Sequence, residues 1–316
     1  MEQNISAAMA QQRAFKATRP ITEAEVEHYE THGFVHLKGI LDADWIETAE
    51  AAFNDVMSAD PETVHHADLG EMANMVSSMG AKTLEDAPDR SSSAEAKPTG
   101  KFWVRSFNWS RIESLANIGT RGPLPEIAAS LMGASRINFY GDQLFLKEPM
   151  SIRRTAFHQD ATYFHLEGNQ CCTMWIPLDK VDTENSTMGY VRGSHKGPLY
   201  LPNTFVSQMP MPGASGHAQL PDIEGNEIDY DIVYCEAEPG DVIIHHVRTL
   251  HGSTGNTSPI RRRRAVGLRY IGEDVRYLER DGAPADSQRS PNLKDGDVMD
   301  SPEFPLIWTE KDGYIA

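Results

Sequence analysis

The sequence is poor in cysteine, with three in 316 residues. Cys171 and Cys172 are adjacent and Cys235 stands alone. This pattern excludes a disulfide framework, and it lacks the paired Cys-x-x-Cys units of a structural zinc site. Because neighbouring residues of a strand point to opposite faces, we expect one of the adjacent cysteines to be buried and the other to face outward.

The chain is also short of positive charge. It has 29 Lys and Arg against 46 Asp and Glu, which gives a net charge of −17. An acidic protein repels nucleic acids and anionic membranes, so we expect neither as a partner. Residues 1–20 are polar and lack the apolar core of a signal peptide or membrane span. We therefore expect a cytoplasmic protein with a small-molecule substrate, and the composition favours neither a monomer nor a homodimer.

No linker rich in Pro, Gly and Ser divides the chain into separate units, and no internal repeat is present. We expect residues 1–20 to form a flexible N-terminal segment and residues 21–316 to form a single domain. Two insertions interrupt the pattern of that domain, near 60–100 and 201–238. Long loops in compact enzymes are often lids, although a plain disordered insertion explains the first equally well.

Capping patterns predict three helices in the first half of the chain, starting at Thr22, Asp42 and Pro123. Glu25 completes a capping box with Thr22, and Gly33 would end that helix. Strand-like runs separated by Gly, Pro and Asn turns fill the second half: Ile137–Lys147, Thr173–Leu178, Thr187–Val191, Asp241–Val247 and Arg263–Tyr270. Helices followed by many strands indicate an α+β fold built on an antiparallel sandwich or jelly roll.

Side chains alternate along a strand, so the run Ile137–Lys147 is predicted to place four side chains of interest on one inward face. Gln143 and Lys147 would share it with Phe139 and Phe145. Polar side chains on an apolar face need partners, because an unpaired buried polar group costs about 1–3 kcal/mol.

Two His-x-Asp motifs occur, and with 12 histidines a chance match is expected. His66 and Asp68 lie in an acidic region with no strand pattern around it. His158 and Asp160 instead lie between two strand-like runs, where side chains at i and i+2 point to the same face. His251 follows a turn and an apolar strand-like stretch.

Two imidazoles and one carboxylate on one side of a metal are the ligand set of non-haem Fe(II) oxygenases, with the opposite positions free for substrate, co-substrate and O₂. We therefore predict that His158, Asp160 and His251 bind iron; the alternative is that they are ordinary hydrogen-bonded side chains. The remaining inward or clustered histidines are interpreted as structural or surface residues: His165, His195, His245 and His246.

Motifs along the chain resemble the phytanoyl-CoA dioxygenase-like (PhyH) family of Fe(II)/2-oxoglutarate oxygenases. In order, they are Glu30–Val35, Asp142–Pro149, Phe157–Asp160, Trp175–Asp179, Arg192–His195, Pro239–Asp241, His251–Ser253 and the Arg run before Ala265. The resemblance runs from Ile21 to Arg276. It implies a double-stranded β-helix, a cupin-like jelly roll with flanking helices, and a dioxygenase that uses Fe(II), 2-oxoglutarate and O₂ and releases succinate and CO₂.

The resemblance also implies a clamp for 2-oxoglutarate, made by an Arg beyond the distal His and by the Ser two places after that His. Ser253 matches the Ser. The family spacing points to Arg262, whereas the family's Arg-x-Ala ending points to Arg263. Arg263 would share a strand face with the small Ala265 and Gly267, which leaves room for a co-substrate, so we favour Arg263.

Further residues are candidates for the site, and one of them follows from the resemblance. Gln143 matches a family position that contacts 2-oxoglutarate. Lys147 could contact a carboxylate or form a salt bridge at the sheet edge. Trp175 could line the co-substrate pocket or pack in the core. Candidates for the substrate pocket are Tyr163, Phe102 and Trp103.

The presence of Asp160 favours hydroxylation, desaturation or ring formation over halogenation, because related halogenases lack this carboxylate and bind halide in its place. We predict hydroxylation of an unactivated C–H bond of a small organic metabolite. One alternative is a cupin-type mononuclear metal dioxygenase or isomerase that does not use 2-oxoglutarate; the Arg run and Ser253 argue against it. A non-catalytic jelly roll that binds a ligand or sugar is the other, and three inward metal ligands argue against that.

Overall fold

The computed structural model describes residues 16–60, 100–203, 210–211, 213–281, 283, 290 and 292–315, together with the backbone of 66–68. Most of the predicted N-terminal segment and of the insertion near 60–100 lies outside these residues. Thr18 is described, and its N–H donates to the carbonyl of Ile40 at 3.0 Å.

The helices lie in the first half of the described chain: α2 (Glu23–His32), α3 (Ala43–Ser58), α5 (Glu113–Thr120) and α6 (Leu124–Met132). The capping box is confirmed, because the Thr22 hydroxyl accepts from the Glu25 N–H at 3.2 Å and the Glu25 carboxylate accepts from the Thr22 N–H at 2.8 Å. Gly33 ends α2 in the left-handed region, with φ 81°. Asp42 caps α3, as predicted. Helix α5 has no side-chain cap hydrogen bond and was not predicted.

A large antiparallel sheet forms the centre of the molecule, with the strand order β1-β10-β7-β12-β4-β14-β15 in the described part of the chain. Its members are β1 (Phe34–Leu37), β10 (Val242–His246), β7 (Cys171–Pro177), β12 (Arg263–Ile271), β4 (Arg136–Lys147), β14 (Leu306–Thr309) and β15 (Gly313–Tyr314). Strand β3 (Phe102–Ser106) pairs with β4, and β2 (His66–Asp68) pairs with β3. Four of the five predicted strand-like runs are strands of this sheet, and the run Thr187–Val191 is a strand of the smaller sheet, all with ends shifted by a few residues.

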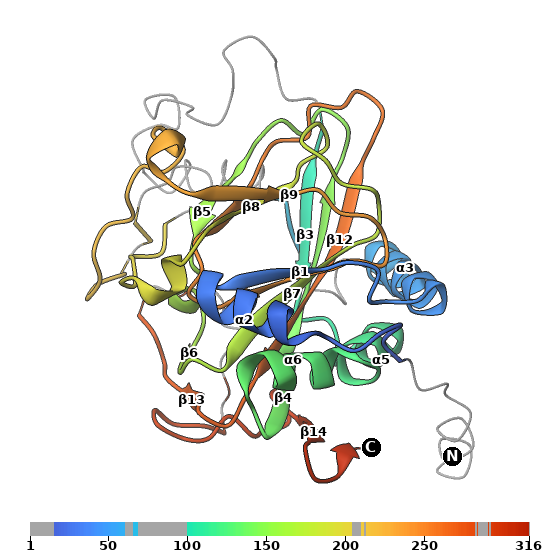
Figure 1. Ribbon diagram of the computed structural model, residues 1–316, viewed down its shortest axis with the longest axis vertical. Helices are drawn as coiled ribbons and strands as arrows, with labels where there is room; N and C mark the ends of the chain where they lie inside the picture. The colour runs from blue at the N-terminus through green and yellow to red at the C-terminus, as the bar shows by residue number, and fades with distance from the viewer. Residues whose placement is uncertain are drawn as a thin grey trace.

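A smaller sheet faces the large one, in the order β5-β11-β8-β9. Its strands are β5 (Thr155–His158), β11 (His251–Ser253), β8 (Met188–Val191) and β9 (Ile232–Cys235). From β4 to β12 the chain passes repeatedly between the two sheets, which is the path of a jelly roll. In Figure 1 the small sheet lies to the left of the large sheet and helices α3 and α5 to the right. The predicted α+β jelly roll is confirmed.

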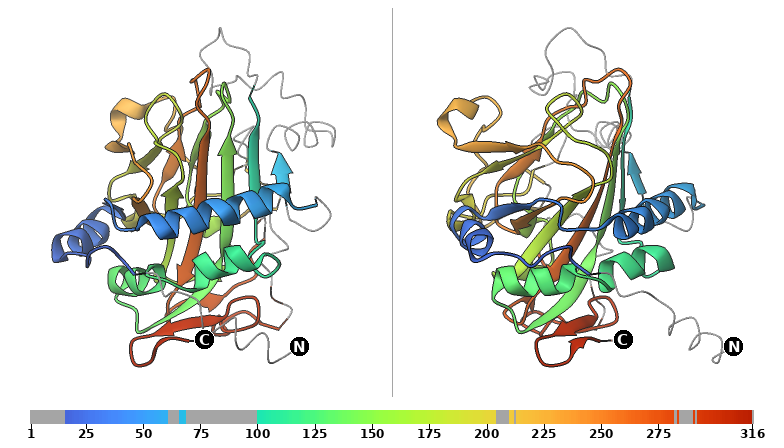
Figure 2. Two further views of the ribbon diagram at one scale, coloured as in Figure 1. Left: turned by 90° about the vertical axis from the view of Figure 1, so that its right-hand side faces the viewer. Right: turned by 45° about the vertical axis from the view of Figure 1, so that its right-hand side comes forward.

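The helices cover the outer face of the large sheet and form the main core with it. Figure 2 shows α3 crossing in front of the strands, with α5 and α6 beside it. Trp45 of α3, Leu115 of α5 and Leu124 of α6 are fully buried in the same core cluster as Val266 and Leu268 of β12. Full burial of one such side chain contributes about 1.5–3 kcal/mol. The helices therefore fix the large sheet from outside and leave its inner face for the pocket.

A bulge in β4 changes the predicted face of one residue. The pairing with β12 shifts between Arg269 and Tyr270, so Tyr140 has no partner in the register. Gly141 follows it with φ 156°, and a Cβ there would lie 2.6 Å from the ring of Phe107. As a result Phe139 packs with the helices, on the face opposite to Gln143. The expectation that these two share a face was wrong, because a bulge shifts the alternation by one residue.

The two adjacent cysteines are both buried, contrary to the expectation of one outward side chain. Cys172 packs in the helix-side core, and Cys171 packs in a second cluster around Tyr140 and Phe164. They do point to opposite faces, but this sheet is covered on both sides.

The C-terminal part wraps around one end of the sandwich. Strand β13 (Arg276–Tyr277) pairs with β6 (Leu166–Glu167) just after the His-x-Asp segment. Among the described residues, no helix is both long enough and apolar enough to cross a membrane.

Candidate metal centre and co-substrate pocket

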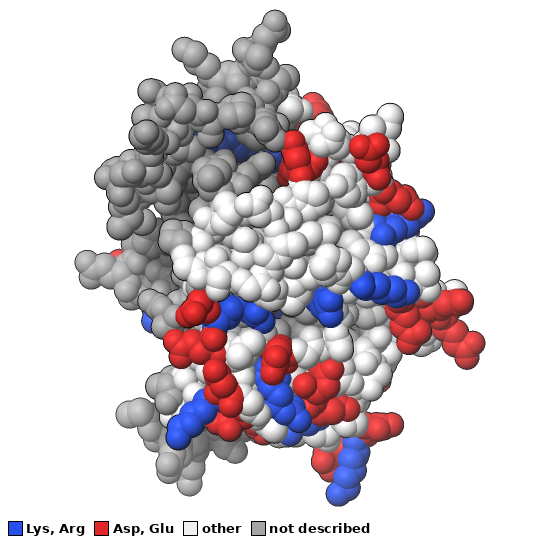
Figure 3. Space-filling model, turned by 90° about the vertical axis from the view of Figure 1, so that its left-hand side faces the viewer, with Lys and Arg blue, Asp and Glu red and all other residues white. Residues whose placement is uncertain are grey.

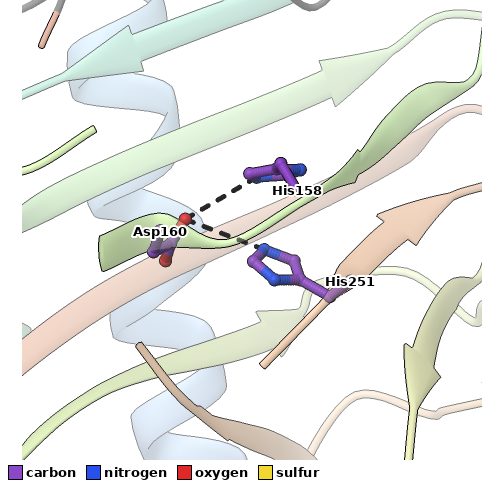
Figure 4. Close-up of side chains that lie close together, drawn as sticks. All are labelled: His158, Asp160 and His251. Atoms are coloured by element: carbon purple, nitrogen blue, oxygen red, sulfur yellow. Dashed lines mark ion pairs between the residues drawn. The ribbon is translucent and has the colours of Figure 1, made fainter. Parts of the chain in front are cut away.

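His158, Asp160 and His251 converge between the two sheets. Strand β5 ends at His158, Gln159 stays extended (φ −113°, ψ 131°), and a single 3₁₀ turn starts at Asp160. Because Gln159 is extended, the His and Asp side chains still point to one side although only the His belongs to the strand. His251 begins β11 directly opposite His158. Figure 4 shows the three side chains turned toward one another.

The distances suit a single ion. Oδ1 of Asp160 lies 3.6 Å from Nε2 of His158 and 3.7 Å from Nε2 of His251. Ligand atoms of the three residues lie within 4.8 Å of one another, and in the described part of the chain this is the one such cluster of His, Cys, Asp or Glu. The side chains of the second motif, His66 and Asp68, lie outside the described residues.

Backbone carbonyls fix both imidazoles. Nδ1 of His158 donates to the Ala156 carbonyl at 2.8 Å, and Nδ1 of His251 donates to the Thr249 carbonyl at 2.9 Å. With the proton held on Nδ1, Nε2 keeps its lone pair, as a metal ligand requires. Burial also lowers the pKa of His251 well below its usual value, which favours the neutral ring.

The two oxygens of Asp160 have different surroundings. Oδ1 faces the two imidazoles, whereas Oδ2 accepts from the Thr173 hydroxyl at 2.7 Å. Oδ2 also lies 3.6 Å from Nε2 of His245 and 3.8 Å from Nε of Arg269. Burial alone would raise the pKa of Asp160, but its polar surroundings, which include the positive charge of Arg269, hold it well below its usual range. The carboxylate is thus held ionised, with Oδ1 available to a metal.

Three neighbours of Asp160 were missed from the sequence: Thr173, His245 and Arg269. His245 had been interpreted as a structural or surface residue, yet its ring is buried beside this carboxylate. The alternation of side chains along β10 predicts the place of His245, because it is two residues from Ile243, which faces inward. On β12, Arg269 likewise comes two residues after Gly267, so both residues belong to the same inward face.

Removing the Thr173 hydroxyl should loosen the metal site. We expect Thr173→Val to weaken Fe(II) binding about tenfold, at the low end of the 10–100-fold losses seen when partners of metal ligands are removed. Anaerobic equilibrium dialysis would measure the dissociation constant. Thr162→Val is a matched control, because Thr162 is buried nearby and bonds only the Gln159 carbonyl, at 3.3 Å. Equal losses in both variants would contradict this role.

The four consecutive arginines at 261–264 have different surroundings in the structure. Arg261 pairs with Asp182 and Glu184 at the surface. The guanidinium of Arg264 lies 2.7 Å from Asp179. These two side chains therefore have counter-charges within the protein and point away from the space between the sheets.

Arg262 is exposed, whereas the side chain of Arg263 is 1% exposed and faces inward. Nη2 of Arg263 donates to the Ser186 hydroxyl at 3.2 Å, while Nε and Nη1 have no hydrogen-bond partner in the part of the chain that the structure describes. The guanidinium lies 5.4 Å from the ring of Trp175. Burial lowers the pKa of Arg263 to about 10, so the group keeps its charge at neutral pH. Buried polar groups are normally paired, so these free donors fit an anionic ligand.

Lys147 is fully buried beside Arg263 but is not in an edge salt bridge. Its Nζ lies within hydrogen-bond distance of four oxygens, which share its N–H donors: the hydroxyls of Ser186 and Ser253, both at 3.0 Å, and the carbonyls of Arg153 and Thr254. Burial lowers the pKa of Lys147 well below its usual value. Lys147 therefore positions Ser253 at the inner end of β11, and direct contact with a carboxylate stays a prediction for both.

Two other predicted residues have protein partners. The Gln143 carbonyl accepts from Nη2 of Arg269. The Tyr163 hydroxyl accepts from the Asn203 N–H at 2.9 Å, and the Tyr163 ring lies 5.6 Å from that of His158. Tyr163 thus holds the start of the insertion near 201–238 beside the metal ligands.

The two aromatic candidates on β3 point in opposite directions. Phe102 is paired with Lys147 and shares its inward face, with the ammonium 4.8 Å from the ring. Trp103 packs against the helix-side core instead, so its prediction as a pocket residue was wrong. Neighbouring residues of one strand cannot both face the pocket.

This donor set suits Fe(II) together with a dicarboxylate. Two neutral imidazoles and a carboxylate match a metal ion with free coordination positions. Arg263 supplies two free guanidinium nitrogen atoms for a distal carboxylate. The buried hydroxyl of Tyr190 likewise has no hydrogen-bond partner among the described residues, and Tyr190 lies in the same cluster as Trp175.

Comparison with known proteins agrees with this chemistry. A sequence model of the phytanoyl-CoA dioxygenase (PhyH) family matches residues 29–265. The chain therefore belongs to the PhyH family of iron- and 2-oxoglutarate-dependent oxygenases, and the predicted family is confirmed. A probable alpha-ketoglutarate-dependent hypophosphite dioxygenase of Stutzerimonas stutzeri is 34% identical over 134 residues, 41% of each chain. A probable phytanoyl-CoA dioxygenase of Caenorhabditis elegans is 27% identical over 164 residues, 50% of this chain and 51% of that protein. These matches span about half or less of the relatives' own length.

Solved structures share the fold at low identity. The epimerase SnoN from nogalamycin biosynthesis, in complex with Fe³⁺, alpha-ketoglutarate and nogalamycin RO, has a TM-score of 0.64 at 20% identity, covering 90% of this chain and 97% of its own. The carbocyclase SnoK from the same biosynthesis has a TM-score of 0.63 at 22% identity, covering 93% and 99%.

Proposed function

We propose that the protein is an Fe(II)/2-oxoglutarate-dependent dioxygenase that hydroxylates an unactivated C–H bond of a small organic metabolite. Two features of the inner side chains carry the proposal: a His-Asp-His cluster and, at Arg263, a buried guanidinium with free donors among the described residues. Tyr190 and Trp175 connect them, because the Tyr190 ring lies 6.0 Å from that of His251 and the Trp175 ring lies 5.4 Å from the Arg263 guanidinium. A mononuclear metal enzyme that does not use 2-oxoglutarate would have no need of that guanidinium.

The residues of the chain would have the following roles. His158, Asp160 and His251 would hold the iron through Nε2, Oδ1 and Nε2. Arg263 would bind the distal carboxylate of 2-oxoglutarate, with Trp175 against its guanidinium and Ser253 beside it. Bound iron and 2-oxoglutarate supply the oxidising power: one atom of O₂ enters succinate as CO₂ is lost, and the other enters the substrate as an alcohol.

Hydroxylation is the proposed outcome because Asp160 keeps one coordination position that a halide would otherwise take. Phe102 and Tyr163 would contribute apolar surface to the substrate. We further propose that residues 21–316 act as one domain in the cytoplasm.

Succinate formation tests the proposal. The protein would be incubated in air with 2-oxoglutarate, with and without Fe(II), and with small molecules grouped by chemical class. We expect iron-dependent succinate, and with a true substrate a product heavier by one oxygen atom. Succinate that forms equally without iron, or substrate oxidation that does not consume 2-oxoglutarate, would contradict it.

A further inference from the structure

We propose that Arg269, with Gln143 beside it, binds the acidic group of an anionic substrate next to the metal centre. The substrate class would be a small molecule carrying a carboxylate or a phosphorus oxyanion. This inference rests on the proposed function and specifies its substrate.

Arg269 is a buried cation with an unused donor. Its side chain, on the inner face of β12, is 4% exposed, and its Nε has no hydrogen-bond partner among the described residues. Nη2 donates to the Gln143 carbonyl, and the guanidinium lies 5.0 Å from the ring of Phe164. Neither neighbour is charged. In the described part of the chain, the only carboxylate within ion-pair distance is that of Asp160, at 3.8 Å from Nε.

An interaction with Asp160 does not by itself explain why Arg269 is buried at this place. The Asp160 oxygen that faces Arg269 already accepts from the Thr173 hydroxyl at 2.7 Å. A separation of 3.8 Å is too long for a hydrogen bond, so the Nε–H is left over. An unsatisfied buried donor of this kind is costly, and an oxyanion would satisfy it.

The charges in the pocket point the same way. Arginine stays protonated in proteins, so Arg263 and Arg269 both contribute positive charge. Fe(II) with these two guanidinium groups exceeds the negative charge of Asp160 and the 2-oxoglutarate dianion by one. Any charge on Lys147 would enlarge the excess. An anionic substrate would remove it.

A second carboxylate, that of Asp142 on β4, interacts electrostatically with Arg269 but faces away from this place. Asp142 is opposite Leu268, whose side chain packs with the helices. Oδ1 of Asp142 accepts from the N–H groups of Asn108 and Trp109, at 2.9 and 2.8 Å. It therefore serves the helix-covered side and forms no ion pair with Arg269.

The inner surface also contrasts with the outside of the molecule. The protein carries a net charge of −17, and on the face in Figure 3 acidic side chains are mixed with Lys and Arg around an uncharged area. Two arginines on one inner strand face, Arg263 and Arg269, stand at opposite ends of the small residues Ala265 and Gly267. One would bind the co-substrate, and the other is left for the substrate.

The guanidinium can form two parallel hydrogen bonds to either a carboxylate or a phosphorus oxyanion. In this proposal Gln143 serves the substrate and not 2-oxoglutarate. It adds a second donor, because its carbonyl accepts from Arg269 and its amide nitrogen has no hydrogen-bond partner among the described residues. The binding geometry alone does not separate the two anions, so the test uses one probe of each kind.

The test is an anaerobic titration of the protein loaded with Fe(II) and saturating 2-oxoglutarate. The probes are propanoate, its neutral isostere propanamide, and inorganic phosphite, and binding is followed by calorimetry and by the visible band of the iron complex. We expect propanoate or phosphite to bind at least about tenfold more tightly than propanamide, because charge-assisted hydrogen bonds are about twice as strong as neutral ones. Whichever anion binds identifies the class.

Variants then locate the binding. Arg269→Gln should remove the preference for the anion, Arg269→Lys should keep part of it, and Arg262→Gln, at the exposed neighbour of Arg263, should change nothing. Equal binding of propanoate, phosphite and propanamide to the wild-type protein would overturn the inference without any variant. Unchanged anion binding in Arg269→Gln would also overturn it. If the band itself fails to form, the proposed function fails and this inference falls with it.

Discussion

Asp160→Ala is expected to abolish specific Fe(II) binding, with a loss of more than about 100-fold in affinity, beyond the range typical of changes around a metal ligand. Oδ1 of Asp160 lies 3.6 and 3.7 Å from the two imidazole nitrogens, so this one oxygen completes the cluster. Without it, His158 and His251 remain as two neutral ligands. Anaerobic dialysis with iron quantification would measure the effect, and a melting curve would check that the variant is folded.

The second His-x-Asp motif supplies the matched control. His66→Ala should leave iron binding and turnover intact, because this motif belongs to β2 at the edge of the large sheet. Loss of iron in His66→Ala with retention in Asp160→Ala would mean that the metal site is at the motif of His66 and not at that of Asp160.

Arg263→Ala should raise the KM for 2-oxoglutarate far more than Arg262→Ala does. Truncating one partner of a buried, hydrogen-bonded charge pair costs about 2–5 kcal/mol, and 2 kcal/mol already corresponds to about thirtyfold. Arg263 is buried with two free nitrogen atoms, whereas Arg262 is exposed. KM would be measured by succinate formation, with direct 2-oxoglutarate binding as a second readout.

Small and equal effects in the two arginine variants would contradict this clamp. A large effect in Arg262→Ala alone would mean that the family spacing, and not the alternation of β12, identifies the co-substrate residue.

Local signals predicted much of the fold. Caps at Thr22 and Asp42 gave correct helix starts because each satisfies backbone N–H groups within a few residues. Helix α5 has no such cap, and strand β3 follows a long insertion, so neither was predicted. At the bulge near Tyr140, Gly141 lies close to the Phe107 ring. This approach involves a residue outside the strand, so the sequence of the strand alone does not predict it.

Alternation gave the strongest information on the site and also set its limits. It singled out Arg263 from a contiguous run, and this is the buried member of the four, since Arg262 is exposed and the other two form ion pairs. One further step along β12 would have reached Arg269. The same rule, applied to β3, separates Phe102 from Trp103. The His-x-Asp motif needed Gln159 to remain extended beyond the strand end, which is a property of the folded chain.

The most direct test of the central claim is an anaerobic titration of the apo-protein with Fe(II) and 2-oxoglutarate, followed by the visible charge-transfer band of their complex. We predict a band that saturates near one iron per chain and is absent in Asp160→Ala. Tight metal binding at His158 and His251 with no band on adding 2-oxoglutarate would contradict the account, and would indicate a metal enzyme that does not use this co-substrate.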